Sequence, residues 1–375
     1  MVQSVFDITI DFEKSHGSYV FDKKTNKEFL DLFSMFSSLP LGYNHSIFDE
    51  SFNKKIKSVS HIRMSNNLFH SDELIDFESK FQKRSFHKNL HFCSTGALAV
   101  EAALKCAFTY TKDPNSVVVG LSNGYHGINC WGFITDNNMQ SVSNRVDDYP
   151  RNHWVNIGLS EMADYISSNL KKISSVIIEP IQCTAGDIYL DASILKEIEA
   201  LCKQNNICFI VDEVQTGFGS TGEIWYSKKI GLDPDIIIFG KKSQICGVMV
   251  NDKYSEAINS KYRKLEVTFD GELIDAIRSS YILDAIEKHS LLERVNRNSA
   301  IISAELSDIY DNYRSVGHLI AFDFKNKKER DGFVSNAYSN HLLLNPTGEK
   351  SIRIRPNLAF SDNELDNFLS IIKSS

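Results

Sequence analysis

The chain has 375 residues, of which 42% are hydrophobic and 24% are charged, a composition typical of a globular protein of about two domains. Its 41 Lys and Arg residues and 48 Asp and Glu residues give a formal net charge of −7, and no basic run with interleaved aromatic residues is present, which argues against a nucleic-acid partner. The sequence shows neither an N-terminal targeting signal nor a run approaching the ~20 apolar residues of a membrane span, so we expect a cytoplasmic protein with no membrane contact.

The first predicted element is a β-hairpin over residues 16–32, where apolar and polar residues alternate on both sides of a Lys-Lys-Thr-Asn turn. Residues 90–95 form a predicted strand, and residues 97–108 form a predicted helix by propensity and periodicity. Further strands are expected at short β-branched runs separated by stretches of helical spacing, at residues 116–120, 175–179, 208–211 and 236–239. This alternation predicts a βαβ sheet and therefore an α/β fold.

The pattern changes towards the C-terminus. A long helix begins near residue 282, and short strands and a closing helix at 362–373 follow it, which is typical of an α+β domain. No internal repeat or long flexible linker separates the parts, so we expect them to share an extensive interface. The expected units are an N-terminal segment (1–45) that packs with the small domain, a large domain (46–275) and a small C-terminal domain (276–375).

Asp212 and Lys241 each end a short apolar run, over residues 207–212 and 235–241. Such runs are typical of strands buried on both faces of a parallel sheet, and their ends meet at the edge where open α/β folds bind ligands. A carboxylate against a pyridinium nitrogen and a lysine that forms a Schiff base with an aldehyde are what pyridoxal phosphate (PLP) requires. The alternative interpretation is an aspartate that closes a turn and a lysine that is a solvated charge.

Loops that follow other predicted strands carry further candidates. Gly96 and Ala97 open a helix, where backbone N–H groups and the helix dipole can hold a phosphate. Tyr125, in a Gly-Tyr-His-Gly loop, could lie flat on a planar cofactor, although a tyrosine packed under a turn would have the same sequence. His126 could be a proton carrier or a hydrogen-bonded structural residue.

Polar residues also end two neighbouring strands. Glu179 closes one run, and Gln215 follows Asp212 in the next, where it could reach a phenolic oxygen; either could instead close a turn. The seven cysteines have neither a Cys-x-x-Cys nor a paired Cys/His spacing, so we expect no structural zinc, no disulfide framework and no metal site. Their positions are 93, 106, 130, 183, 202, 208 and 246.

Six motifs carry a family resemblance that runs from about residue 17 to the C-terminus. They are Phe29-Leu-Asp-Leu-Phe-Ser-Met-Phe, Gly96-Ala-Leu-Ala-Val-Glu, Tyr125-His-Gly, Glu179-Pro-Ile-Gln, Val211-Asp-Glu-Val-Gln-Thr-Gly and Phe239-Gly-Lys-Lys-Ser-Gln-Ile-Cys-Gly-Val-Met. Together they resemble the class III aminotransferases, which are fold-type I PLP enzymes, and most of all the L-lysine 6-aminotransferase branch. The resemblance implies a large domain with a mostly parallel sheet of the seven-stranded type and a smaller α+β C-terminal domain.

The resemblance also implies a role at the cofactor for each matching residue. Lys241, directly after the glycine, would be the Schiff-base lysine, and Asp212 would lie at the pyridine nitrogen. Once substrate displaces it from the aldehyde, Lys241 would move the substrate proton, for which burial must lower its pKa. The other cofactor-binding residues would be Gln215 near the ring hydroxyl, Tyr125 on the ring face, Gly96 and Ala97 at the phosphate, and Glu179.

Two further residues imply partners. Thr268, in Val-Thr-Phe-Asp-Gly, resembles the threonine that reaches the phosphate from the partner subunit, so the resemblance implies a homodimer. Arg355, in Ile-Arg-Ile-Arg-Pro, resembles the arginine that binds the α-carboxylate of glutamate or 2-oxoglutarate, a task suited to a guanidinium.

The chain departs from the family pattern at two positions. The family has Glu-Gly-Gly-Asp where this chain has Thr184-Ala-Gly-Asp, and that glutamate pairs with the carboxylate-binding arginine, whereas Thr184 cannot neutralise Arg355. Lysine 6-aminotransferases have an arginine for the lysine carboxylate where this chain has Ile128. We therefore expect an amino transfer between glutamate or 2-oxoglutarate and an amine, aldehyde or keto compound that is less anionic than free L-lysine.

Two alternatives remain open from the residues. A PLP-dependent isomerase or decarboxylase of the same fold would use Lys241 and Asp212 equally well. A non-catalytic PLP-fold binding protein would explain the missing substrate residues, although an intact Lys241 argues against it. A nicotinamide-binding Rossmann domain is disfavoured, because no Gly-x-Gly-x-x-Gly follows an early strand.

Overall fold

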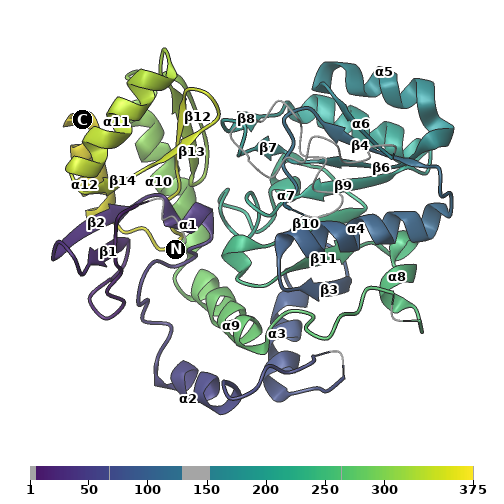
Figure 1. Ribbon diagram of the computed structural model, residues 1–375, viewed down its shortest axis with the longest axis horizontal. Helices are drawn as coiled ribbons and strands as arrows, with labels where there is room; N and C mark the ends of the chain where they lie inside the picture. Colours follow the sequence, from purple (N-terminus) through teal and green to yellow (C-terminus); the bar gives the residue numbers. More distant parts are fainter. Residues whose placement is uncertain (1–5, 67, 129–152, 263, 375) are drawn as a thin grey trace.

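A seven-stranded sheet forms the centre of the larger, α/β part of the computed structural model, which describes residues 6–66, 68–128, 153–262 and 264–374. β11 runs antiparallel to both of its neighbours, and the other neighbouring strands are parallel. The α/β fold expected from the sequence is therefore confirmed. In spatial order the strands are β3 (Asn89–Cys93), β11 (Cys246–Val250), β10 (Ile236–Phe239), β9 (Cys208–Asp212), β6 (Ile173–Ile178), β4 (Val117–Leu121) and β5 (Trp154–Ile157) (Figure 1).

Helices cover both faces of this sheet, because successive side chains of its buried strands point to opposite faces. Ile210 and Ile238 pack with α4 and α8 on one face. Val211 packs with α5 and α6, and Ile237 with α3 and α9, on the other face. The helix bounds are α3 (Asp72–Gln82), α4 (Gly96–Thr111), α5 (Leu159–Asn169), α6 (Ala192–Gln204), α8 (Glu256–Asn259) and α9 (Leu273–Lys288).

The C-terminal part is an α+β unit to which the N-terminal segment adds a small sheet (Figure 1). Its antiparallel sheet has the order β12 (Asp311–Val316), β13 (Leu319–Asp323), β16 (Ser351–Ile354), β15 (Asn345–Thr347). The hairpin of β1 (Tyr19–Asp22) and β2 (Lys27–Asp31) pairs with β14 (Leu342–Leu343). The helices are α10 (Leu291–Leu306), α11 (Lys327–Ser339) and α12 (Asp362–Ser374).

Short elements connect these layers. α2 (Glu50–Val59) packs on α9, and β7 (Ile181–Gln182) and β8 (Ile188–Tyr189) form a hairpin after β6. α7 spans Tyr226–Ile230, and one-turn 3₁₀ helices lie at η2 (Leu170–Lys172), η3 (Lys241–Ser243) and η4 (Asp252–Tyr254). The expected domain boundary at 275/276 falls inside α9, which packs against α3 of the large domain, so the division of the chain into domains stays a prediction.

Two strands of the large sheet, β5 and β11, are not among the predicted elements. β11 contains Gly247, which weakens the sequence signal for a strand. The glycine is required there because a Cβ would lie 2.3 Å from the backbone oxygen of His91 on β3. Within the described ranges, the structure has no helix whose length and apolar character would let it cross a membrane.

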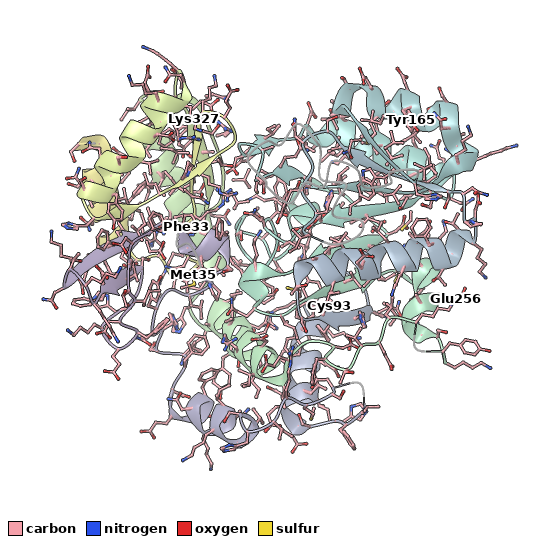
Figure 2. The ribbon with its side chains drawn as sticks, viewed as in Figure 1. Phe33, Met35, Cys93, Tyr165, Glu256 and Lys327 are labelled. Carbon is pink, nitrogen blue, oxygen red and sulfur yellow. The ribbon has the colours of Figure 1, made fainter. Side chains whose placement is uncertain are left out.

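The segment called α1 (Ser34–Ser37) is a left-handed turn rather than a helix. Its four residues have φ values of 48°, 49°, 59° and 71°. Non-glycine residues rarely adopt this conformation, and each costs roughly 1–2 kcal/mol. Figure 2 labels Met35 in this segment and Phe33 directly before it, at the edge of the C-terminal part of the molecule.

Candidate active site

A cavity of about 250 Å³ lies where β4, β6, β9 and β10 end. Parallel strands bring their carboxyl ends to one edge of a sheet, so loops that are distant in sequence meet there. Thr184, Thr268 and Arg355 are not part of its lining. The residues expected at the site that do line it are Gly96, Ala97, Tyr125, Ile128, Glu179, Asp212, Gln215 and Lys241.

Asp212 ends β9 and is held by two contacts. Its Oδ2 lies 2.8 Å from Nδ1 of His126, and its Oδ1 accepts a hydrogen bond from the backbone N–H of Val214 at 3.1 Å. Both Asp212 and His126 are buried. Burial opposes the charged form of His126, but the hydrogen bond that His126 donates to Asp212 and the negative charge of Asp212 outweigh burial, so the pKa of His126 is raised. His126 therefore orients Asp212 and balances its charge.

Lys241 begins the η3 turn directly after β10, with φ at +53°. A non-glycine residue in this conformation is strained, and such residues cluster at active sites. Burial, reinforced by the positive charge of Arg353, lowers the pKa of Lys241 to about 8. A lysine amine with this pKa is partly neutral near neutral pH and can accept a proton.

The N-terminus of α4 forms another wall of the cavity. Thr95 is its N-cap, and the Thr95 hydroxyl accepts a hydrogen bond from the backbone N–H of Leu98 at 3.3 Å. Gly127, with φ at +85°, approaches so closely that a Cβ there would lie 3.0 Å from the Cβ of Ala97. Small residues keep this helix end open, and its dipole favours an anion such as a phosphate.

Gln215 and Glu179 face the middle of the cavity. The Gln215 Oε1 atom is buried and has no hydrogen-bond partner within the described chain, so a hydroxyl donor of a ligand would satisfy it. Glu179 accepts a hydrogen bond from the backbone N–H of Tyr125 at 2.7 Å, and burial raises the Glu179 pKa to about 8. The lining thus offers a carboxylate, an amine, an unpaired acceptor and an anion-binding helix end, which fits PLP.

Two arginines near the end of β16 have different surroundings. Arg355 is fully buried, and its Nη2 donates to both carboxylate oxygens of Asp187 at 2.6 and 2.7 Å. Arg353 donates to the backbone oxygen of Cys183 at 2.8 Å, and no carboxylate partner is found for it among the described residues. The expected role of Arg355 is not favoured by this geometry, because substrate would have to break a buried ion pair.

The remaining expected residues lie outside or at the edge of the cavity. Ile128 is 63% exposed at its mouth. Thr184 is partly buried, and its backbone oxygen accepts a hydrogen bond from the hydroxyl of Thr347 at 3.2 Å. Thr268 is exposed, and its backbone oxygen accepts a hydrogen bond from the hydroxyl of Ser65. Thr268 therefore has no role within this cavity of a single chain.

Sequence reasoning missed Arg353 and the pairing of Asp187. Arg353 stands in the same Ile-Arg-Ile-Arg run as Arg355, and strand periodicity places both on one side, so the run alone could not distinguish them. Asp187 follows Thr184 within the motif that departs from the family pattern, but its partner is 168 positions away. The described residues contain no cluster of side chains that could hold a metal, and Cys130 lies outside them.

Comparison with known proteins gives a consistent family assignment. The model of the family "Aminotransferase class-III" matches residues 2–375. The L-lysine-epsilon aminotransferase of Streptomyces clavuligerus is 29% identical, over 100% of this chain and 92% of that protein. The acetylornithine aminotransferase of Archaeoglobus fulgidus is 28% identical, over 96% and 94%.

A solved structure is also similar. The lysine aminotransferase from M. tuberculosis in the internal aldimine form superposes with a TM-score of 0.91 at 26% identity, covering 100% of this chain and 96% of that one. These relatives are all aminotransferases, so the isomerase, decarboxylase and non-catalytic alternatives are not favoured.

Proposed function

Because the chain belongs to the class III aminotransferases, which depend on PLP, we propose that it moves an amino group between glutamate or 2-oxoglutarate and a second substrate other than free L-lysine. The observation that carries this proposal is the charge of the cavity lining. Among the lining residues that the structure describes, Lys241 is the only Lys or Arg, and the apolar Ile128 lies at the mouth of the cavity. Apart from Lys241, a second carboxylate would therefore find no Lys or Arg in the lining that the structure describes.

PLP, when bound, supplies an aldehyde and an electron-withdrawing ring. Lys241 would hold the aldehyde, Asp212 the ring nitrogen and the N-terminus of α4 the phosphate. Tyr125 would lie against the ring face, and Gln215 would accept a hydrogen bond from the ring hydroxyl. The buried, unpaired Oε1 of Gln215 supports the last contact directly.

The chain's own groups account for proton movement. Asp212 Oδ2 lies 2.8 Å from Nδ1 of His126, and the Asp212 side chain would favour a proton on a ring nitrogen that contacts it. The Lys241 amine, with a pKa of about 8, would take the proton from the substrate carbon and deliver it to the cofactor.

We assign the carboxylate of glutamate or 2-oxoglutarate to Arg353 instead of Arg355. Arg353 is close enough to Lys241 for its charge to lower the pKa of that amine. Burial lowers the pKa of Arg353 itself to about 10, so an incoming carboxylate would compensate a buried positive charge. Arg355 already has its compensating charge in Asp187.

The proposed assembly is a homodimer in which Thr268 reaches the partner's phosphate site. Thr268 is exposed, and apolar side chains that a partner could cover lie beside it in sequence, at Val267 (48% exposed) and Phe269 (37%). Mixing two inactive variants, Lys241→Ala and Thr268→Ala, tests this arrangement. Heterodimers would regain one intact site, whereas mixtures that stay inactive in a confirmed heterodimer would contradict a shared site.

A steady-state screen of amino donors with 2-oxoglutarate tests the substrate assignment. We expect amines that carry no carboxylate to be turned over faster than L-lysine, with one glutamate formed per amine consumed. L-lysine turnover exceeding that of every other amine would refute the substrate assignment and leave the aminotransferase chemistry intact. The cytoplasmic location stays a prediction, which cell fractionation would test.

A further inference from the structure

The turn that carries Lys241 is joined to the strained Ser34–Ser37 turn by two side chains. The Lys242 Nζ donates to the backbone oxygen of Ser37 at 3.0 Å and to its hydroxyl at 2.8 Å. The Gln244 side-chain amide donates to the backbone oxygen of Ser38 at 2.7 Å. Lys241 and Gln244 are themselves left-handed, with φ of 53° and 60°. Two strained turns that are far apart in sequence therefore meet here, since Ser37 and Lys242 are 205 positions apart.

The Ser34–Ser37 turn is also held from its other side. Asp31 Oδ1 accepts hydrogen bonds from the backbone N–H groups of Phe33 and Ser34 at 3.0 and 2.8 Å. The Ser34 hydroxyl donates to the backbone oxygen of Arg355 at 2.6 Å. Strained backbone persists only where its surroundings determine it, and here the contacts come from Asp31, from the end of β16 and from the Lys241 turn.

Lys242 has an unusual environment for a lysine. Its side chain is 2% exposed, and within the described chain it contacts Ser37 but no carboxylate. Burial, followed by the charges of Arg355 and Lys241, lowers its pKa to about 7. Packing alone would be served better by an apolar residue, because a buried amine without a counter-charge is unfavourable. Its geometry therefore calls for a role in hydrogen bonding.

We propose that Lys242 is a positioning residue for the amino-transfer reaction, which fixes the turn of Lys241 by binding Ser37 of the left-handed turn. The two adjacent lysines point to different places: Lys241 into the cavity and Lys242 to Ser37. With Ser37 held, the η3 turn cannot rotate about the strand end, and the Lys241 amine keeps its place in the cavity. The inference rests on the proposed role of Lys241.

The kinetic consequence is specific. Moving a proton requires the Lys241 amine within hydrogen-bond reach of the reacting carbon, so a loose turn lowers kcat. Substrate binding depends on other groups, including Arg353, so KM should change little. A purely structural Lys242 would alter thermal stability and leave the kcat of the folded enzyme unchanged.

Purified holoenzymes carrying Lys242→Met and Lys242→Arg test the proposal. Lys242→Met should lower kcat by at least about tenfold and change KM by less than about threefold. Hydrogen–deuterium exchange in residues 32–39 should rise in the same variant, a readout independent of activity. Lys242→Arg keeps the charge and the donors, so it should recover part of kcat and slow the exchange again.

Lys229→Met provides a matched control. Lys229 is partly buried and also donates to a backbone oxygen, that of Thr221 at 2.6 Å, but it does not line the cavity. Its replacement should leave kcat and the exchange of residues 32–39 unchanged. An equal loss of kcat in this control would show that the effect of Lys242→Met does not come from the contact of Lys242 with Ser37.

A Lys242→Met enzyme with kcat within about twofold of the wild type, or with unchanged exchange in residues 32–39, would overturn the proposal. If Lys242→Met does not fold, Ser37→Ala removes one acceptor and should lower kcat by about threefold; an unchanged kcat would then overturn it. A wild-type enzyme without cofactor absorbance would instead overturn the role of Lys241.

Discussion

The two ends of the candidate site treat buried charge differently. At the cofactor end, Asp212 pairs with His126, and both still line the cavity. At the end formed by β16, Arg355 is fully buried and forms an ion pair with Asp187, while Arg353 has no carboxylate partner among the described residues. The difference shows that burial and charge do not by themselves mark a binding group. A buried charge belongs to a site when a ligand can still reach it or compensate it.

The largest expected effect comes from the cofactor end. Lys241→Ala should lower kcat by about 10³-fold or more, because the proton-transferring base is lost. Lys242 should not substitute, since its amine is bonded to Ser37. Steady-state assays of amino transfer check this expectation. Activity that persists in Lys241→Ala but disappears in Lys242→Ala would exchange the roles of the two lysines.

Substitutions of the two arginines should have the next largest effects, and these effects should differ in kind between Arg353 and Arg355. Arg353→Met should raise KM for glutamate and for 2-oxoglutarate by about 10- to 100-fold, because a charge-assisted hydrogen bond contributes about 1.5–3 kcal/mol. Arg353→Lys keeps the charge but loses the paired donors, so its KM should lie between those of the wild type and of Arg353→Met. Initial rates at varied glutamate check the order of the three enzymes.

Arg355→Met should act on the free energy of unfolding instead, lowering it by about 3–5 kcal/mol because Asp187 is left as a buried, unpaired charge. Chemical denaturation measures this change. The double variant Arg355→Met with Asp187→Leu removes both charges and should regain most of the stability. If the double variant folds and its KM for glutamate is as high as that of Arg353→Met, Arg355 and not Arg353 would be the residue that binds the carboxylate.

Ile128 offers a smaller effect at the mouth of the cavity. Ile128→Arg should increase kcat/KM for L-lysine by about fivefold, since an exposed ion pair contributes at most about 1 kcal/mol. Ile128→Gln is the matched polar variant without charge and should leave the preference among donors unchanged. No gain for L-lysine in a folded, active Ile128→Arg enzyme would remove Ile128 from the explanation of substrate choice.

The pH dependence of Lys241 provides a further test of similar size. In cofactor-free protein, acetic anhydride should modify Lys241 about fivefold faster at pH 8 than at pH 7 and level off above pH 9, because only the neutral amine reacts. Peptide fragmentation separates Lys241 from Lys242, and the exposed Lys261 serves as internal reference. A rate that still rises steeply through pH 10 would contradict the lowered pKa.

The lowered pKa of Lys241 also predicts how the free energy of unfolding changes with pH. The pKa of Lys241 falls from 10.5 to about 8 on folding, so the folded state disfavours the charged amine. This cost is fully present below about pH 8 and disappears as the pH rises to 10.5. In Lys241→Met the cost is absent, so the stability difference between the two cofactor-free proteins should shrink from pH 8 to pH 10.

The sequence alone predicted the residues of the site that lie at the ends of strands. Asp212, Glu179 and Lys241 each follow a short apolar run, so the parallel sheet alone brings them together. It did not predict contacts between residues that are far apart in sequence. The pairing of Arg355 with Asp187 and of Lys242 with Ser37 depends on how the N-terminal and C-terminal segments pack against the part of the chain that forms the seven-stranded sheet, which no local pattern encodes.

The fold shows the same division. The alternation of short strands and helices sufficed for the α/β sheet, whereas β11 was missed because Gly247 interrupts its pattern. The left-handed Ser34–Ser37 turn could not be foreseen either, since its residues have no preference for positive φ. Tertiary contacts determine both features.

Reduction with borohydride followed by peptide mapping tests the central claim most directly. The wild-type enzyme loaded with PLP should retain one phosphopyridoxyl group per chain after reduction, attached to the Nζ of Lys241. Fragmentation of the labelled peptide distinguishes this position from Lys242. A label on Lys242 or on any other residue, or a protein that retains no label after reduction, would contradict the account.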